Sequence, residues 1–142
     1  MYRPNASNYR DNEILSTPRE QLVPLLYRHL VIRLRTAGEQ IRDGDIAGKA
    51  ESLSRATDIV YELLGSLDHD AGGELAERLS ALYAYFLSEF REVGRSMDAA
   101  RLETTLELID SLHEAWARAA DEVVGERSGG RATGSLGSGV SA

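Results

Sequence analysis

Residues 37–53 read AGEQIRDGDIAGKAESL, and this stretch decides the predicted fold. Gly44 is typical of the residue that ends a helix, and Asp45 directly after it is typical of a helix N-cap. One helix therefore ends and another begins within about two residues. Because so short a connection turns the second helix back along the first, we expect an antiparallel helical pair here.

Apolar residues three and four positions apart flank this turn on both sides, which predicts two amphipathic helices. Thr17, Pro18 and Glu20 form a helix start with a capping box, so the first helix is expected from about residue 18 to Asp43. Pro24 either kinks its first turn or moves the regular start closer to Pro24. The expected apolar stripes are Leu22, Leu25, Leu26, Leu30, Leu34, Ala37 and Ile41, and then Ile46, Lys49, Leu53, Ala56, Val60, Leu63 and Leu67.

The same spacing predicts two more helices after a break at residues 68–73. The third is expected to begin near Glu74, and the fourth to run from about Ala99 to residue 124, just before Gly125. No segment alternates with the period of a strand. The predicted fold is therefore all-α, an antiparallel up-down four-helix bundle over residues 18–124.

The two ends of the chain lack this periodicity. Residues 1–17 show no sustained pattern and are interpreted as an irregular N-terminal arm. Residues 125–142 read GERSGGRATGSLGSGVSA, in which ten of eighteen residues are Gly or Ser. That composition cannot bury enough apolar surface to fold, so a disordered C-terminal tail is predicted.

Charge and composition exclude several classes of protein. The 142 residues include 16 Lys and Arg against 23 Asp and Glu, a formal net charge of −7, and the two signs are interleaved. A binder of the phosphate backbone needs a clustered basic face, so no nucleic acid partner is expected. The sequence holds no Cys, and no apolar run suits a signal peptide or a membrane span. We expect a cytosolic protein that is not inserted in a membrane.

Enzyme signatures are also missing from the sequence. A di-metal carboxylate centre in a helical bundle needs two acid-and-histidine pairs spaced i, i+3. Only Asp110 and His113 have that spacing, and one half-site does not hold two metal ions. There is no nucleophile motif of the G-x-S-x-G type. We therefore expect no catalytic residue, metal or cofactor, and interpret the chain as an interaction protein.

Tyrosines provide the first indication of an interaction surface. Tyr83 and Tyr85 are about 200° apart around a helix, so both cannot point into one core. At least one should lie at a surface or groove, where an apolar ring with a hydrogen-bonding tip suits recognition. Ordinary packing at the rim of the core is the alternative for this pair.

Short motifs in a fixed order resemble the flagellar export chaperone FliS family over about residues 9–120. The motifs include a tyrosine-containing arm, a Thr-Pro helix start, a Gly-Asp turn, and a double glycine before the third helix. They are Tyr9-Arg-Asp-Asn12-Glu-Ile14, Thr17-Pro18, Leu22, Leu26-Tyr27, Gly44-Asp45-Ile46, Leu53, Ala56, Ile59, Leu63, Ser66-Leu67-Asp68, Gly72-Gly73-Glu74-Leu75-Ala76, Leu82-Tyr83-Ala84-Tyr85 and Trp116. Each motif is short, and their order and spacing carry the resemblance.

The resemblance implies a cytosolic chaperone that binds the disordered C-terminal segment of flagellin. It implies that the chaperone blocks premature polymerisation and helps deliver flagellin to the flagellar type III export gate, which is then a second partner. The predicted client-binding residues are those of the matched motifs that the core does not need. They are Tyr9, Ile14, Leu22, Leu26, Tyr27, Leu67, Leu82, Tyr83, Tyr85 and Phe86, while Leu53, Leu63, Leu79, Leu106, Ile109 and Trp116 are predicted core.

The N-terminal arm carries two apolar residues, Tyr9 and Ile14, that could anchor it to the bundle. We hypothesise that it packs over part of the groove when the groove is empty and is displaced by the client. The alternative is an arm that always stays in place. Unchanged hydrogen exchange of residues 5–17 on adding flagellin peptide would refute displacement.

Two other functions compete with the flagellin chaperone. One is a helical bundle that binds another flagellar client or a regulator of flagellar gene expression. The other is a metal-dependent bundle enzyme, which a stoichiometric pair of iron or manganese ions in purified protein would support. Titration with the flagellin C-terminal segment separates the chaperone from the first alternative.

Overall fold

The computed structural model describes residues 19–140, and within them the surroundings of side chains 22–119, 121 and 122. Four helices follow one another in this range. They are α2 (Arg19–Asp43), α3 (Ile46–Gly65), α4 (His69–Ser96) and α5 (Ala99–Val140). No strand occurs between residues 19 and 140, and the predicted all-α class is confirmed.

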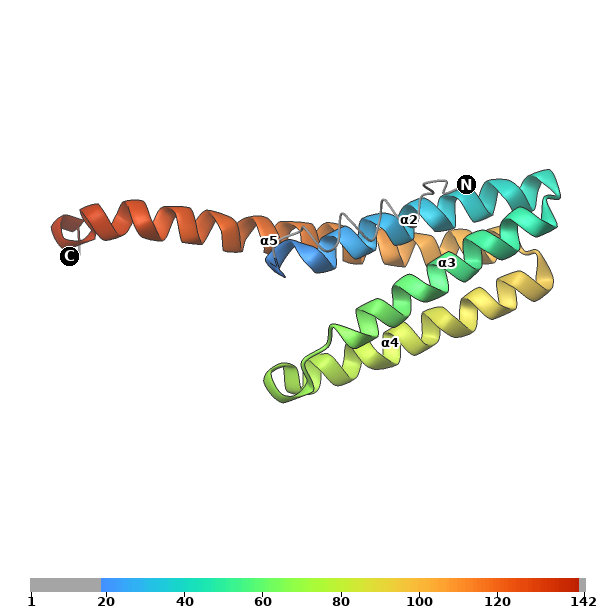
Figure 1. Ribbon diagram of the computed structural model, residues 1–142, viewed down its shortest axis with the longest axis horizontal. Coiled ribbons are helices and arrows are strands. Elements are labelled where there is room, and N and C mark those ends of the chain that lie inside the picture. Colours follow the sequence, from blue (N-terminus) through green and yellow to red (C-terminus); the bar gives the residue numbers. More distant parts are fainter. Residues whose placement is uncertain (1–18, 141–142) are drawn as a thin grey trace, which may run out of the picture.

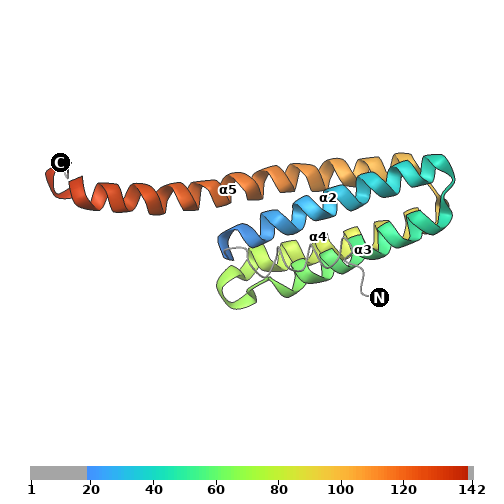
Figure 2. The same cartoon turned by 45° about the horizontal axis from the view of Figure 1, so that its top comes forward.

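The four helices form a closed ring of neighbours. α2 packs against α3 and α5, and α4 packs against the same two helices, while the diagonal pairs α2–α4 and α3–α5 have no close backbone approach in the described range. Arg35 pairs with Asp110 and Arg42 with Glu103, so a rising residue number in α2 meets a falling one in α5. The two helices are therefore antiparallel, as Figures 1 and 2 also show.

The Gly44–Asp45 turn has the caps that the sequence predicts. Gly44 has φ +74°, the left-handed conformation that lacks a penalty only for glycine. The Asp45 carboxylate accepts a hydrogen bond of 2.9 Å from the backbone N–H of Gly48. A Cβ on Gly48 would lie 2.2 Å from Asp45 Oδ2, so a glycine here leaves the cap undisturbed.

The turn between α3 and α4 has a more complex shape. Asp68 caps α4, whose first turn, residues 69–72, precedes a non-helical Gly73 at φ 50° and ψ −123°. Regular helix resumes at Glu74, where the sequence predicts the third helix to begin. Figure 1 shows the α3–α4 hairpin diverging from α2 and α5 toward this turn. The bundle is thus widest at the α3–α4 end.

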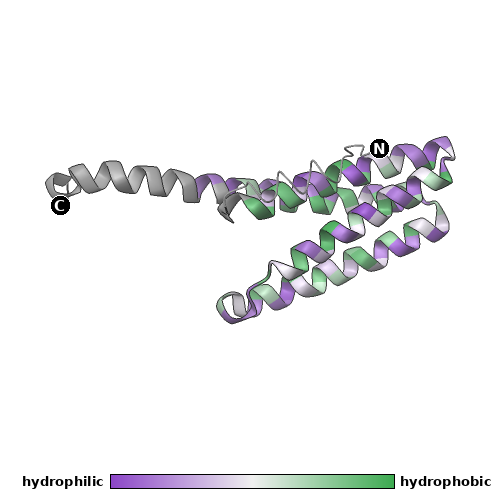
Figure 3. Ribbon diagram, viewed as in Figure 1, coloured by the Kyte–Doolittle hydropathy of each residue, from purple (hydrophilic) through white to green (hydrophobic). Residues whose placement is uncertain are grey.

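The core lies along the inner faces of all four helices. Figure 3 shows hydrophobic residues recurring along these helices between hydrophilic ones. The large side chains that are fully buried in the core are Tyr27, Tyr83, Phe86, Leu26, Leu30, Leu34, Ile59, Leu63, Leu102, Ile109, Val60 and Val93. The predicted core residues Leu53, Leu63, Leu79 and Ile109 are buried, and Leu106 and Trp116 pack against the core while partly exposed.

Two buried charged groups have partners near the α4–α5 end. Lys49 Nζ donates a 2.9 Å hydrogen bond to the Gly94 carbonyl, which satisfies one of the last carbonyls of α4. Glu89 accepts two hydrogen bonds from the Arg101 guanidinium, at 2.7 and 2.9 Å. This bidentate pair joins α4 to α5 beside their connecting turn.

Two features of the backbone bear on the predicted helix boundaries. Pro24 lies inside α2, which is already helical from Arg19. α5 continues to Val140, beyond Gly125, where the sequence predicts the last helix to end. Figure 1 shows its last part projecting past the other three helices, where no neighbouring helix lies beside it. The predicted disorder of residues 125–142 in solution is a separate property and stays a prediction.

Candidate functional site

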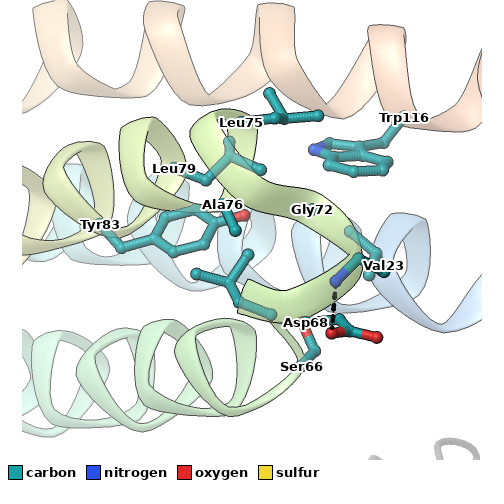
Figure 4. A pocket seen from close by; sticks show the side chains of 11 residues that line it. Val23, Ser66, Asp68, Gly72, Leu75, Ala76, Leu79, Tyr83 and Trp116 are labelled. Atoms are coloured by element: carbon teal, nitrogen blue, oxygen red, sulfur yellow. Dashed lines mark hydrogen bonds between the residues drawn. The ribbon is translucent and has the colours of Figure 1, made fainter.

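An apolar pocket of about 310 Å³ opens where α3 turns into α4, at the wide end of the bundle (Figure 4). Side chains from α2, α4, α5 and the α3–α4 turn surround it. We call it the Tyr83 pocket. Its lining residues are Val23, Ser66, Leu67, Asp68, Ala71, Gly72, Leu75, Ala76, Leu79, Tyr83 and Trp116.

Small residues on α4 leave this space open. Gly72 lacks a side chain, and a Cβ at that position would come within 3.0 Å of the Ala76 methyl group. The kink at Gly73 separates the first turn of α4 from the regular helix. Leu75, directly after the kink, is 59% exposed. The same turn therefore supplies both the pocket and an apolar side chain at its edge.

Two aromatic side chains, Tyr83 and Trp116, line the pocket, and the Tyr27 ring packs against both. Tyr27 is fully buried, with its ring centroid 6.4 Å from that of Tyr83 and 6.5 Å from that of Trp116. The Tyr27 hydroxyl donates a 2.8 Å hydrogen bond to the Tyr83 hydroxyl. These rings join α2, α4 and α5 around one polar contact.

Burial keeps both phenols protonated. Burial raises the pKa of Tyr27 far above its ordinary value, and its hydrogen bond to Tyr83 raises it further. Burial also raises the pKa of Tyr83, although the hydrogen bond that it accepts from Tyr27 lowers that pKa in part. The hydroxyl group of Tyr83, which lines the pocket, is therefore neutral at physiological pH.

The mouth of the pocket is acidic. Asp68 lines the pocket, and its Oδ1 accepts hydrogen bonds from the backbone N–H groups of Asp70 and Ala71 at 3.1 and 3.0 Å. Asp68 and Asp70 are both exposed. Because carboxylates repel anions, the mouth favours neutral or basic groups.

The described part of the chain holds neither a cluster of metal ligands nor a membrane span. His113 Nδ1 lies 3.9 Å from Asp110 Oδ1, and no group of three or more metal-ligating side chains occurs among the described residues. No described helix is long and apolar enough to cross a membrane. The Tyr83 pocket is therefore the candidate site developed below.

Comparison with known proteins decides the family. The family model described as "Flagellar protein FliS" matches residues 1–123. The chain belongs to the FliS family. It is 31% identical to the flagellar secretion chaperone FliS of Salmonella typhimurium over 107 residues, which cover 75% of this chain and 79% of the relative. The Escherichia coli chaperone of the same name is 29% identical over 107 residues, or 75% and 79% of the two chains.

A more distant relative extends this similarity. The flagellar secretion chaperone FliS of Bacillus subtilis is 24% identical over 111 residues, covering 78% of this chain and 82% of the relative. The resemblance inferred from the motifs is thus confirmed. Membership assigns this chain to a family of flagellar chaperones that act in protein export.

The predicted client-binding residues of this FliS chain fall into four groups. Leu67 and Tyr83 line the pocket. Leu26, Tyr27 and Phe86 are buried in the core at 2% exposure or less, and none of them lines the pocket. Tyr9 and Ile14, with the rest of the arm, lie outside the described residues.

The remaining three lie at partly open positions. Leu22 and Leu82 are partly buried and pack against the core. Tyr85 is 47% exposed, whereas Tyr83 is 1% exposed, which confirms that at least one of the two lies at the surface. Client contact by any of these residues stays a prediction.

Sequence reasoning missed several residues that line the pocket of this FliS chain. Leu79 and Trp116 were expected in the core, and their periodicity is indeed that of core residues. In the sequence, Gly72 indicates a flexible turn between helices, and Ala76 belongs to the same motif. Their small size four positions apart, directly beside a helix break, is the signal that could have indicated a cavity. Val23, Ala71 and Leu75 gave no such signal.

Proposed function

We propose that this FliS chain is a cytosolic export chaperone that binds the C-terminal segment of flagellin. Binding would prevent premature polymerisation and assist delivery of flagellin to the flagellar type III export apparatus. The observation that carries the proposal is the family match over residues 1–123. The relatives are flagellar secretion chaperones, which supports the chaperone and secretion roles. Flagellin as the client is part of the proposal.

The Tyr83 pocket supports this proposal as a binding site for a helical segment. Its walls are mainly apolar, and Leu75 and Tyr85 are large exposed side chains on the same helix, α4. An amphipathic helix docks by placing apolar side chains into such a groove. The pocket would take one anchoring side chain, and the exposed face of α4 would extend the contact.

The energetics suit a client that must later be released. A disordered segment that folds as it binds loses about 2–5 kcal/mol or more of its interaction energy to ordering. The affinity therefore stays moderate even when the contact area is large. Such binding needs no reaction chemistry, and we assign the chain no catalytic residue and no cofactor.

Isothermal titration tests the proposal directly. The full-length chain is titrated with the C-terminal segment of flagellin from the same bacterium, and a scrambled segment of the same composition is the control. We expect saturable binding of the native segment alone. No detectable binding at tens of micromolar would refute the flagellin assignment and favour another flagellar client.

A further inference from the structure

Among the described residues, the paired tyrosines at the Tyr83 pocket leave one hydroxyl proton without an acceptor. Two hydroxyl groups carry two protons, and the Tyr27–Tyr83 hydrogen bond uses the proton of Tyr27. The Trp116 ring lies 6.5 Å from the Tyr27 ring, and an indole N–H can only donate, so Trp116 takes no proton from the pair. Among the residues that the structure describes, none accepts the proton of Tyr83. Within the described part of the chain, the hydrogen bond from Tyr27 therefore ends at Tyr83, whose own proton stays available.

Tyr83 is placed to offer that proton to an occupant of the pocket. Its side chain is 1% exposed and lines the pocket. Figure 4 shows its ring extending from α4 with the hydroxyl oxygen close to Ala76, among the side chains that line the pocket. A donor enclosed by apolar groups is costly unless it finds an acceptor. An occupant that brings an acceptor can take the Tyr83 proton in place of water.

We propose that the Tyr83 pocket is a recognition site for an uncharged side chain with an apolar body and an oxygen acceptor, which Tyr83 hydrogen-bonds. Glutamine is the side chain that fits this description best. Its methylene groups match the walls formed by Leu79 and Trp116, and its carbonyl oxygen can reach the hydroxyl donor. Its amide N–H groups then face the mouth of the pocket, toward acidic side chains.

The acidic mouth distinguishes this ligand class from a carboxylate. Asp68 lines the pocket and Asp70 is exposed beside it. An anionic acceptor would be repelled by both carboxylates, whereas a neutral amide would be attracted through its N–H groups. The pocket therefore selects a neutral acceptor over a charged one. That the side chain belongs to a flagellin segment rests on the proposed function, but the chemistry of the pocket does not.

Small probes test the pocket independently of any client. Acetophenone carries a neutral carbonyl acceptor, ethylbenzene has a similar shape without one, and benzoate is the anionic counterpart. Dissociation constants are measured by NMR titration of the Trp116 indole N–H in the full-length chain. In the wild type, acetophenone should bind more tightly than ethylbenzene. In Tyr83→Phe, the affinity of acetophenone relative to that of ethylbenzene should fall about tenfold. Benzoate should bind more weakly than acetophenone to the wild type.

Two variants separate the donor from the stability of the core. Tyr27→Phe removes the tyrosine pair but keeps the Tyr83 proton, so the wild-type ratio should persist. Tyr83→Phe should lose it. An equal ratio in all three proteins, or equal loss in both variants, overturns the proposal. If Tyr83→Phe does not fold, nuclear Overhauser contacts in the wild type decide instead. Contacts from acetophenone to the Ala76 methyl group support the site, and contacts elsewhere overturn it.

Titration with the flagellin segment then separates the two proposals. If the wild type binds the probes as expected but not the segment, the pocket chemistry stands and the flagellin assignment fails. If the wild type binds the segment but Tyr83→Phe does not change the probe ratio, the flagellin assignment stands and the pocket chemistry fails. If the wild type binds both the probes and the segment, the glutamines of the segment are replaced one at a time by leucine. One of these replacements should weaken binding to the wild type about fivefold and leave binding to Tyr83→Phe unchanged. Finding no such glutamine overturns its assignment as the occupant.

Discussion

The Tyr27 hydroxyl donates a 2.8 Å hydrogen bond to the Tyr83 hydroxyl across 56 positions of sequence. Tyr27 lies on α2 and Tyr83 on α4, two helices that are diagonal in the bundle and have no close backbone approach in the described range. The bond therefore crosses the centre of the core. It links α2 and α4, the diagonal pair whose backbones do not approach each other, and one of its two partners, Tyr83, lines the Tyr83 pocket.

This buried pair predicts that the protein loses stability at alkaline pH. The folded-state pKa values of Tyr27 and Tyr83 are raised, so their contribution is complete below the ordinary tyrosine pKa of about 10 and is lost as pH rises above it. Each tyrosine should contribute a slope of roughly 1.4 kcal/mol per pH unit. Unfolding by denaturant between pH 8 and 11.5 measures it. The slope above pH 10 should decrease in Tyr27→Phe, and an identical slope in both proteins would contradict the prediction.

The Glu89–Arg101 pair predicts sensitivity to acid. Hydrogen bonds from Arg101 lower the pKa of Glu89, so the pair stabilises the fold above the unfolded pKa of glutamate and loses this effect as pH falls through the lower folded value. Glu89→Gln should lower the melting temperature at pH 7 by roughly 3–6 °C and flatten its decline between about pH 5 and 3. Glu74→Gln is the control, since its partner Arg78 and Glu74 itself are exposed. Equal effects of the two variants would count against the prediction.

The backbone conformation of Gly44 predicts that replacing this glycine destabilises the fold through backbone strain alone. Gly44→Ala would meet no atom within 4 Å but would be held at φ +74°, so it should destabilise the fold by about 1 kcal/mol. Gly65→Ala is the matched control, because it also meets no atom within 4 Å and lies in α3. It should leave stability unchanged or raise it by up to about 1 kcal/mol. Denaturant unfolding of both variants checks the pair, and equal signs would refute this account of the turn.

The exposed position of Leu75 at the edge of the Tyr83 pocket predicts that a flagellin client contacts it. Leu75→Ser should weaken binding of the flagellin segment about tenfold, because the apolar contact of a side chain at the edge of the pocket is lost. Stability should change little, since Leu75 is 59% exposed. Ile46→Ser is the control. Ile46 is 65% exposed at the other end of the bundle, beside the α2–α3 turn. Calorimetric titration measures both, and equal weakening would place the client elsewhere.

The composition of residues 125–142 predicts that they add nothing to the stability of the bundle. The FliS family model ends at residue 123, and Gly and Ser are poor helix formers. Removing residues 125–142 should change the melting temperature by less than about 2 °C. The loss of helical circular dichroism signal should be smaller than eighteen helical residues would give. A fall of several degrees would show that the segment packs on the bundle.

Local signals in the sequence determined the helices and their turns. Gly44 and Asp45 determined the first turn, because only glycine adopts φ +74° freely and an aspartate can satisfy the N–H groups at a helix start. The three-four periodicity determined which face of each helix is buried, and the FliS motifs determined the family. The end of α5 was predicted less well, since composition indicated an end near Gly125 and the helix reaches Val140.

Tertiary structure alone decided which apolar residues face an open pocket. Periodicity reports that a residue lies on the inner face, but not whether a neighbouring side chain fills the space before it. Tyr27 and Phe86 were predicted to contact a client and are core, whereas Trp116 was predicted core and borders the pocket. The hydrogen bond between Tyr27 and Tyr83 is likewise invisible in sequence. It depends on the distance between two diagonal helices, which the packing of the whole bundle sets.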